Sequence, residues 1–288
     1  MSSVVYFDTN VFDNLIKKTG GVTEADETAL RAAVSSGRVR IVVSHINILE
    51  TFAAFKRRSD VARAQLLLIV SLSDWDRFAK YSSSILEDDI KHFAFNGERA
   101  NTPYEDGRQA AHVRSVLQGI IDGQIGIDKL ELVISEDRDH KTRFRVMVNE
   151  SKAEIATKLE ELRALGDIPS FEEFFEENVE EYVGAFVDTF DSGEACKQRG
   201  LAKMLKIPSI RALIGVGMSF MYRINAEKKS PKSSADRDIQ HAVCAAAAAD
   251  VFVTHDEELS LLLRRVPIRG LRVIRLRQLL DAVTANCR

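Results

Sequence analysis

The chain has 288 residues, of which 45% are hydrophobic and 29% charged, and its formal net charge at pH 7 is −3. This length suits one large domain or two modest ones, and the composition is that of an ordinary soluble globular protein. A net charge so close to zero gives no general attraction to nucleic acid, so any such binding must come from a local basic patch.

The cysteines are three in number and widely separated, at Cys196, Cys244 and Cys287. This spacing contains no Cys-x-x-Cys pair and argues against a disulfide framework and against a zinc site. The sequence has no apolar run long enough to cross a bilayer, and it does not begin with the basic-then-apolar pattern of a signal peptide. We therefore expect a protein of the reducing cytoplasm that does not act at a membrane.

The chain opens with an apolar run that ends abruptly in polar residues. Val-Val-Tyr-Phe at positions 4–7 precedes Asp8, Thr9 and Asn10, and apolar residues then recur at helical spacing over positions 11–16. This pattern predicts a buried parallel strand followed by a helix that Thr9 or Asn10 caps. Asp8 then lies at the carboxyl end of a central strand, where open α/β sheets bind ligands. A carboxylate there is costly to bury unless a cation joins it.

The next segments repeat this alternation of strand and helix. Residues 23–34 predict a helix, residues 39–43 a second strand, and Ser44 the N-cap of the helix that follows. Glu50 falls in the second turn of that helix, again just beyond the end of a strand.

The middle of the chain has a different pattern. From residue 74 to residue 206 the strand-like runs nearly vanish, and the segments are helical and strongly charged. Residues 95–107 have the turn chemistry of a loop, and residues 136–163 predict a long charged helix. Ser170 and Glu173 form a capping box at the start of another helix. We predict a mostly helical insertion, residues 74–206, between two parts of one core, residues 1–73 and 207–288.

The alternation returns in the last part of the chain. An apolar helix over 207–224 precedes a basic loop, and Ser233 or Ser234 caps an alanine-rich helix that runs to about Ala249. The remaining predicted elements are a strand, a helix, a strand and a last helix, with the first three at 251–254, 257–263 and 271–276. Strands that alternate with helices at both ends of the chain indicate one parallel sheet assembled from two separated segments.

Acidic residues occur at a strand end or in an early helical turn at four places: Asp8, Glu50, Asp236 with Asp238, and Asp256. Because right-handed crossovers bring the carboxyl ends of parallel strands to one edge of the sheet, we expect these side chains to share one cleft. Such a cluster repels itself unless a hard divalent cation neutralises it, and oxygen ligands favour Mg²⁺ or Mn²⁺ over zinc. A metal ion in an acidic cleft suits phosphodiester hydrolysis by water.

The order of these motifs resembles that of the PIN-domain nucleases. The matching stretches are Val-Tyr-Phe-Asp-Thr-Asn at 5–10, Glu50 in the helix after the second strand, Asp-x-Asp-x-x-x-Ala at 236–242 and Phe-Val-Thr-x-Asp at 252–256. The resemblance covers the two ends of the chain and not the middle. Many PIN toxins of toxin–antitoxin pairs lack so large an insertion, so the likeness extends to nuclease activity rather than to a toxin role.

The resemblance implies a Rossmann-like three-layer α/β/α sandwich with a central parallel sheet. It also implies a Mg²⁺- or Mn²⁺-dependent endoribonuclease that leaves a 5′-phosphate and a 3′-hydroxyl. The catalytic, metal-binding set is then Asp8, Glu50, Asp238 and Asp256, and Asp236 is a further ligand or supports a second metal. Asn10 and Thr254 match the supporting polar residues of the family.

The acidic residues also have ordinary structural interpretations. Asp8 and Asp256 are placed to cap the helices that follow them, and the helix dipole favours Asp236 and Asp238 in a first turn. Glu50 could be a solvated helix residue, although its neighbours are apolar. The site interpretation is preferred for Asp8, Glu50, Asp238 and Asp256, and both interpretations stay open for Asp236.

Several basic residues surround the expected cleft. Lys228, Lys229 and Lys232 lie in a loop that runs directly into the acidic helix, and we predict that they contact phosphate, so RNA affinity should fall with salt. His241 follows Asp238 by three residues on the same helix face and could hydrogen-bond a carboxylate or a phosphate, although such a histidine is more often structural. His45 and His255 flank the expected cleft.

Two other functions fit the sequence. The first is a non-catalytic PIN-like scaffold that binds RNA or a partner protein, or forms homo-oligomers, through the helical insertion. The second is a phosphatase of the haloacid-dehalogenase type, which also opens with an apolar strand and an Asp but requires Asp-x-Asp where this chain has Asn10. For the nuclease itself, single-stranded DNA is an alternative substrate to RNA.

Overall fold

The fold is built around a parallel sheet, seen in a computed structural model that describes residues 2–55, 58–126, 169–227 and 234–285. The helix predicted over 136–163 and the predicted lysine contacts of the 228–233 loop lie outside these ranges. The sheet has four strands in the order β2–β1–β3–β4. Their bounds are Ser3–Phe7 for β1, Val39–Val42 for β2, Val251–Val253 for β3 and Arg272–Ile274 for β4.

The two ends of the chain meet in this sheet. Strand β1 pairs in parallel with β2 on one side and with β3 on the other, so that Tyr6 lies opposite both Val42 and Phe252. Strand β4 pairs in parallel with β3 and forms one edge. The prediction of one parallel sheet assembled from two separated segments is therefore confirmed.

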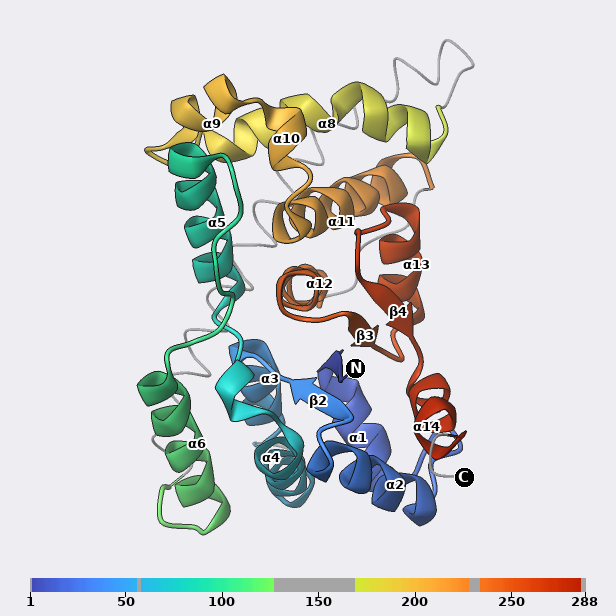
Figure 1. The fold of residues 1–288 in the computed structure, drawn as a ribbon. Coiled ribbons are helices and arrows are strands. Elements are labelled where there is room, and N and C mark those ends of the chain that lie inside the picture. Colours follow the sequence, from blue (N-terminus) through green and yellow to red (C-terminus); the bar gives the residue numbers. More distant parts are fainter. Residues whose placement is uncertain (1, 56–57, 127–168, 228–233, 286–288) are drawn as a thin grey trace.

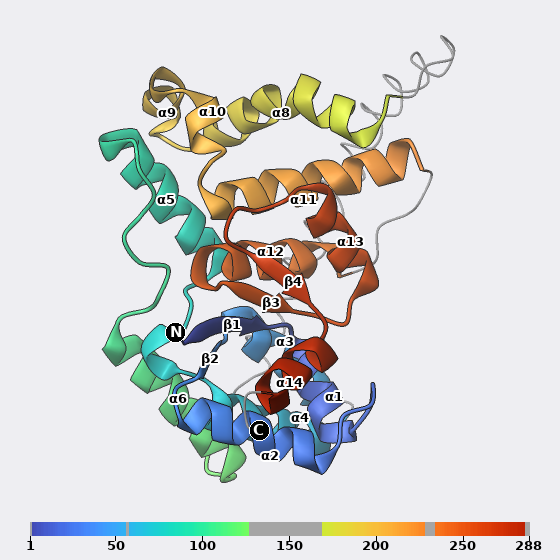
Figure 2. The ribbon, with the colours of Figure 1, turned by 45° about the vertical axis from the view of Figure 1, so that its right-hand side comes forward.

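The alternation of side chains along β1 divides the core into two layers. Val5 and Phe7 face one layer and Tyr6 faces the other, and all three are fully buried. The first layer contains α1 (Thr9–Lys17), α2 (Glu24–Ser35), α3 (His45–Phe55), α4 (Ser59–Leu72), α6 (Gly107–Ile121) and α14 (Leu276–Ala285). The second contains α5 (Ser82–Asn96), α11 (Pro208–Asn225), α12 (Ala235–Ala248) and α13 (Glu257–Arg265). Figures 1 and 2 show the sheet between these layers, which confirms the predicted α/β/α sandwich.

The predicted insertion supplies helices to both layers and an outer shelf. Helix α8 (Phe171–Val187) begins with the predicted capping box of Ser170 and Glu173 and packs on α11, with α9 (Gly193–Arg199) and α10 (Leu201–Met204) beside it. The start of the insertion stays close to the sheet. Ser73 and Ala79 form parallel bridges to Ile41 and Ser44, on either side of a 3₁₀ turn at Trp75–Arg77. The chain on both sides of the predicted boundary at residue 74 thus runs alongside β2.

Helix starts differ from the sequence prediction in two places. Helix α1 begins at Thr9 and its N-cap residue is Asp8, so Thr9 and Asn10 lie in the first turn and the prediction that one of them caps the helix was wrong. Ser234 is the N-cap residue of α12, as predicted, but its side chain makes no capping hydrogen bond. Because the side chains of Asp8, Thr9 and Asn10 do not cap α1, they are available for other contacts at the end of β1.

Among the residues that the structure describes, no helix combines the length and the apolar character needed to span a membrane.

Candidate functional site

The site is centred on Asp8, immediately beyond β1. The Asp8 backbone N–H donates to the Val253 carbonyl at 3.0 Å, which fixes the residue beside the end of β3. Its carboxylate is 6% exposed, and Oδ2 accepts hydrogen bonds from Thr254 Oγ1 at 2.6 Å and Asn10 Nδ2 at 2.8 Å. Both predicted supporting residues therefore contact Asp8 directly and orient it.

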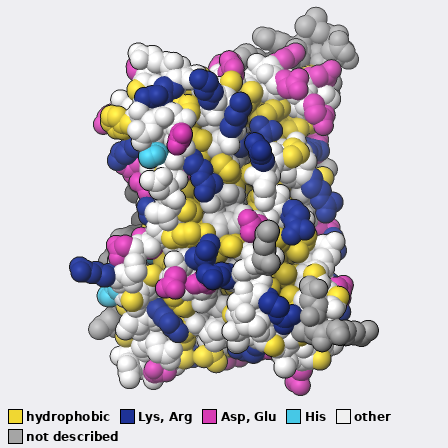
Figure 3. Space-filling model, viewed as in Figure 1, with side chains coloured by type: hydrophobic (Ala, Val, Ile, Leu, Met, Phe, Trp, Pro, Cys, Tyr) yellow, Lys and Arg dark blue, Asp and Glu magenta, His cyan; other side chains and the backbone are white. Residues whose placement is uncertain are grey.

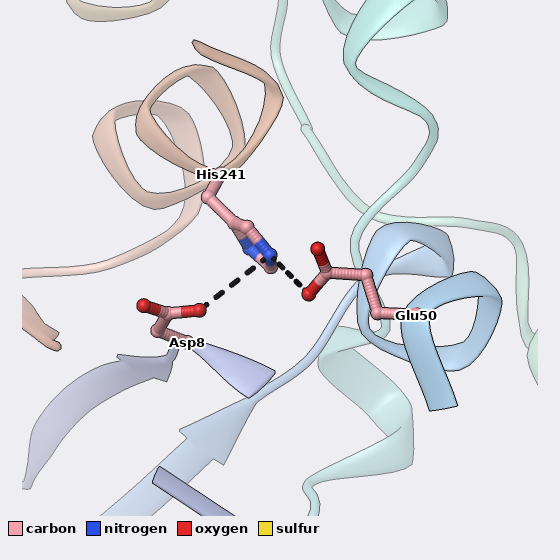
Figure 4. A group of neighbouring side chains, drawn as sticks. All are labelled: Asp8, Glu50 and His241. Atoms are coloured by element: carbon pink, nitrogen blue, oxygen red, sulfur yellow. Dashed lines mark hydrogen bonds and ion pairs between the residues drawn. The ribbon is translucent and has the colours of Figure 1, made fainter. Parts of the chain in front are cut away.

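His241 joins Asp8 to Glu50, although these residues come from three different elements. Figure 4 shows Asp8 at the end of β1, Glu50 on α3 and His241 on α12, all directed toward one another. His241 Nε2 lies 3.1 Å from Glu50 Oε2 and 3.7 Å from Asp8 Oδ1. The sequence placed His241 on the correct helix face as a hydrogen-bond partner for a carboxylate, and the geometry puts it at the centre of the cluster.

A chain of hydroxyl groups lies behind His241. Tyr6 Oη is 2.9 Å from His241 Nδ1 and 2.7 Å from Ser44 Oγ. Asn47 accepts from the Ser44 backbone N–H at 2.9 Å and donates to the Phe7 carbonyl at 2.9 Å, which fixes the direction of its amide. Because each group in this buried chain has a partner, the imidazole is held with Nε2 facing the carboxylates.

Glu50 has cationic partners on both of its oxygens. Oε1 lies 3.2 Å from Arg237 Nη1, and Oε2 faces His241 as described. Burial alone would raise the pKa of Glu50, but His241, Arg237 and a hydrogen bond from Thr9 outweigh it and hold that pKa at about 2. Glu50 is therefore ionised at neutral pH and already neutralised by the protein.

Asp238 has the opposite environment. It is 8% exposed in the first turn of α12, and its Oδ2 has no hydrogen-bond partner among the described residues. Burial and repulsion from Asp256, Asp8 and Glu50 raise the pKa of Asp238 to about 8, despite the opposing effect of His241. Metal-free Asp238 is thus largely protonated at neutral pH, and a cation would be needed to ionise it there.

Asp256 has two roles. It is the N-cap residue of α13, and its Oδ1 accepts from the backbone N–H groups of Glu258 and Leu259 at 2.8 and 3.0 Å. The capping interpretation considered for Asp256 is therefore correct. Its charge also raises the pKa of Asp8 and of Asp238, so it belongs electrostatically to the cluster.

The charges of Asp8 and His241 depend on each other. Burial raises the pKa of Asp8, which His241 lowers and Glu50 raises further. Burial likewise works against the imidazolium, but Glu50, Asp8 and Asp238 outweigh it and raise the pKa of His241 above its ordinary value. The carboxylates therefore favour the protonated form of His241, which adds to the positive charge that Arg237 supplies to the cluster.

The other predicted site residues are placed less closely. Asp236 is 4% exposed in the first turn of α12. Like Asp238 and Asp256, it is not part of the group of Asp8, Glu50 and His241, whose ligand atoms lie within 4.8 Å of one another in the described part of the chain. Lys228, Lys229 and Lys232 lie outside the described residues. On the face shown in Figure 3, Lys and Arg side chains are scattered among acidic and apolar ones and form no single patch.

Sequence reasoning missed Tyr6 and Arg237. Tyr6 was taken as part of an apolar strand, although a tyrosine hydroxyl buried in a strand needs a partner. Arg237 lies between two acids in a first helical turn, where the helix dipole disfavours a cation. A buried arginine at such a position points to a carboxylate from another element, and this is the signal that could have found it.

The donor set suits a hard divalent cation. Asp8, Asp238 and Asp256 offer carboxylate oxygens, and the unpartnered buried oxygen of Asp238 lacks the positive charge that would let it ionise. Glu50 and His241 also present ligand atoms, but in the arrangement described they bond to each other. The chemistry of these oxygens is the kind that Mg²⁺ or Mn²⁺ prefers, but one ion shared by Asp8, Asp238 and Asp256 would require their carboxylates to come closer together than they lie here.

Comparisons of the chain with family models, with curated proteins and with solved structures found no match.

Proposed function

We propose that this protein is a PIN-like, metal-dependent endoribonuclease. The observation that carries the proposal is the environment of Asp238, a buried carboxylate with an unpartnered oxygen and a pKa raised to about 8 beside three other acids. A fold bears the cost of holding such a group when a ligand supplies the missing charge. The cluster also lies at the carboxyl edge of a parallel sheet, which is the usual ligand position in open α/β folds.

Mg²⁺ or Mn²⁺ held by Asp8 and, once their oxygens move closer to it, by Asp238 and Asp256 would lower the pKa of a water molecule and neutralise charge on the phosphate oxygens. Asp8 is oriented for this role by Thr254 and Asn10. Glu50, the fourth predicted ligand, would have to exchange its bond to His241 or to Arg237 for the metal. In the described arrangement Glu50 instead forms ion pairs with these two cations.

The test is cleavage of end-labelled single-stranded RNA with Mn²⁺ or Mg²⁺, compared with a chelator control. Asp8→Asn keeps the size of the side chain and removes its charge, and we expect it to lower the rate at least about 1,000-fold, or about 4 kcal/mol. Products should carry a 5′-phosphate and a 3′-hydroxyl. Unchanged cleavage by Asp8→Asn, or a 2′,3′-cyclic phosphate product, would show the proposal to be wrong. The same assay with single-stranded DNA measures the preference for RNA.

A second candidate, the non-catalytic PIN-like scaffold, is favoured by one observation. Glu50 already has two cationic partners, so part of the cluster is neutral without metal. Titration with Mn²⁺ separates the candidates, because only a protein with a metal site gains stability by mass action. At 100 times Kd, bound metal should raise the unfolding midpoint by about 5–10 °C. A scaffold should show no such rise, and Asp8→Asn should remove the rise from a metal-binding protein.

The phosphatase alternative gains nothing from the geometry. Asn10 occupies the position where that family requires a second Asp, and its amide donates to Asp8. It cannot act as the acid of an aspartyl-phosphate mechanism.

A further inference from the structure

A stacked pair of rings, Tyr81 on His45, joins the N-cap of α5 to the first residue of α3. The two ring centroids are 3.8 Å apart and the planes differ by 8°. Tyr81 is 44% exposed, which makes it one of the few large, largely apolar side chains open to solvent among the described residues. His45 beneath it is only 6% exposed.

The lower ring of this pair is rigidly held. His45 Nε2 donates to Glu105 Oε1 at 2.9 Å, and Phe78 packs against the imidazole with its centroid 4.6 Å away. Burial lowers the pKa of His45, although Glu105 opposes this, so the imidazole is neutral at pH 7. Tyr81 therefore rests on a fixed, uncharged ring, and little side-chain entropy is left for it to lose on binding.

The strand register places Tyr81 at the same edge of the sheet as the site. Ala79 pairs in parallel with Ser44, which follows β2, and β2 pairs with β1, which ends just before Asp8. Tyr81 thus emerges at the carboxyl edge about two strand spacings, or roughly 10 Å, to the side of Asp8.

Contacts to α12 support this placement. The carbonyl of Lys80 accepts from Cys244 Sγ at 3.8 Å, and Cys244 follows His241 by three residues on α12. The segment that ends in Tyr81 therefore packs against the same helix that carries Asp238 and His241. A strand of nucleic acid that places a phosphate at the acidic cluster has a neighbouring base within reach of this ring.

We propose that Tyr81, backed by His45, is a stacking platform for a base of single-stranded RNA whose scissile phosphate lies at the acidic cluster. The proposal rests on the proposed nuclease function, because it takes the bound strand to be the substrate. Every base has a π-face, so such a platform accepts any sequence. It also requires an unpaired base, so this site selects single-stranded over double-stranded RNA.

The test measures binding of a fluorescein-labelled single-stranded RNA in chelator, where no metal-dependent cleavage occurs. Tyr81→Ala should weaken binding about 5- to 150-fold, the range found when an aromatic platform loses its ring. Tyr81→Phe keeps the ring and should bind within about twofold of the unsubstituted protein. The matched control is Phe95→Ala, because Phe95 is 75% exposed at the far end of α5, about 20 Å along the helix from Tyr81.

An RNA of the same length with abasic sites separates stacking from phosphate contacts. It should bind the unsubstituted protein and Tyr81→Ala equally, since neither can stack on a missing base. The proposal is overturned if Tyr81→Ala binds as tightly as Phe95→Ala, if Tyr81→Phe is as weak as Tyr81→Ala, or if the unsubstituted protein binds no RNA.

Binding and cleavage assays on the same variants test the stacking platform and the nuclease activity separately. Tyr81-dependent binding without any metal-dependent cleavage would refute the nuclease and keep the stacking platform. Cleavage that depends on Asp8, with RNA affinity unchanged in Tyr81→Ala, would refute the platform and keep the nuclease.

Discussion

Glu50 and Asp238 are carboxylates of one cluster, yet the protein treats them in opposite ways. Glu50 lies between Arg237 and His241, and its pKa is held at about 2. Asp238 has an oxygen without a hydrogen-bond partner in the described part of the chain, and its pKa is raised to about 8. Glu50 is on α3, in the first helical layer, and Asp238 is on α12, in the second.

This difference divides the cluster into two parts: Glu50, whose charge the protein itself offsets, and Asp238, whose charge it does not. The charge on Glu50 stabilises the folded protein without any ligand, because it offsets positive charge on the buried Arg237 and His241 side chains. The charge on Asp238 destabilises it until something positive arrives. Substitutions on the two sides should therefore change the stability of the metal-free protein in opposite directions.

The largest effect on stability is expected for Glu50→Gln. The variant removes the carboxylate that lies 3.2 Å from the buried Arg237 guanidinium, and Arg237 cannot lose its proton to relieve the cost. We expect a loss of about 2–3 kcal/mol in the free energy of unfolding at pH 7, below the cost for a fully buried pair because Glu50 is 21% exposed. Because the pKa of Glu50 is about 2 when folded and 4.5 in its ordinary state, this contribution should disappear as the pH falls through that interval.

The control for this prediction is the double variant Glu50→Gln/Arg237→Met. Removing both charges should recover most of the lost stability, as measured by urea unfolding of four proteins: the unsubstituted chain, Glu50→Gln, Arg237→Met and the double variant. If the losses in the free energy of unfolding of the two single variants instead add up in the double variant, Glu50 stabilises the fold through packing rather than through its charge. The contrast with Asp238 would then not be electrostatic.

Asp238→Asn should have the opposite sign. The folded pKa of about 8 lies above the ordinary value of 3.8, so between these values the folded chain holds a proton that the unfolded chain has lost. Stability of the unsubstituted protein therefore falls as pH rises through this window. Asn does not ionise, and the variant should exceed the unsubstituted protein by about 2 kcal/mol at pH 8.5 but not at pH 4.

The measurement is the difference between the two unfolding midpoints across this pH range, in chelator. At the proposed metal site, saturating Mn²⁺ should reverse the order, because the metal would stabilise the protein that keeps the Asp238 carboxylate more than the variant. If Asp238→Asn is less stable than the unsubstituted protein at pH 8.5 in chelator, then the negative charge of Asp238 does not destabilise the metal-free fold, and the argument from its raised pKa is wrong.

Much of the fold could be predicted from the sequence because its signals are local. Apolar runs that end in polar residues predict β1 and β3, and the same run in β1 explains why its side chains are buried on both faces of the sheet. Element ends were less predictable, as at β4, where Leu276 already starts a helix with its side chain buried. The capping error at Thr9 and Asn10 has a similar cause, since Asn10 is engaged by Asp8.

The candidate site was predictable only in part. The positions of acidic residues at strand ends and in early helical turns predicted a cluster of Asp8, Glu50, Asp238 and Asp256. The structure brings Asp8 and Glu50 together with His241, while Asp238 and Asp256 lie outside that group. The pairing of Arg237 and His241 with Glu50 depends on which side chains face each other. The packing of α12 on the sheet decides this, and the spacing of residues along the sequence does not. Arg237 could not be assigned to Glu50 from a distance of 187 positions along the chain.

The smallest effect is expected for Tyr6→Phe, which removes the hydroxyl behind His241. His241 Nδ1 and Ser44 Oγ both lose a partner, so stability should fall by about 1 kcal/mol. Tyr104→Phe is the matched control, because it removes a hydroxyl that donates to the Ala248 carbonyl at 2.8 Å and should cost a similar amount. Only Tyr6→Phe should also lower metal-dependent cleavage, by about tenfold, because it loosens the imidazole that orders the acidic cluster. Equal activities in the two variants would mean that the hydroxyl chain stabilises the fold without positioning His241, and that the cluster keeps its geometry through Glu50 and Arg237 alone.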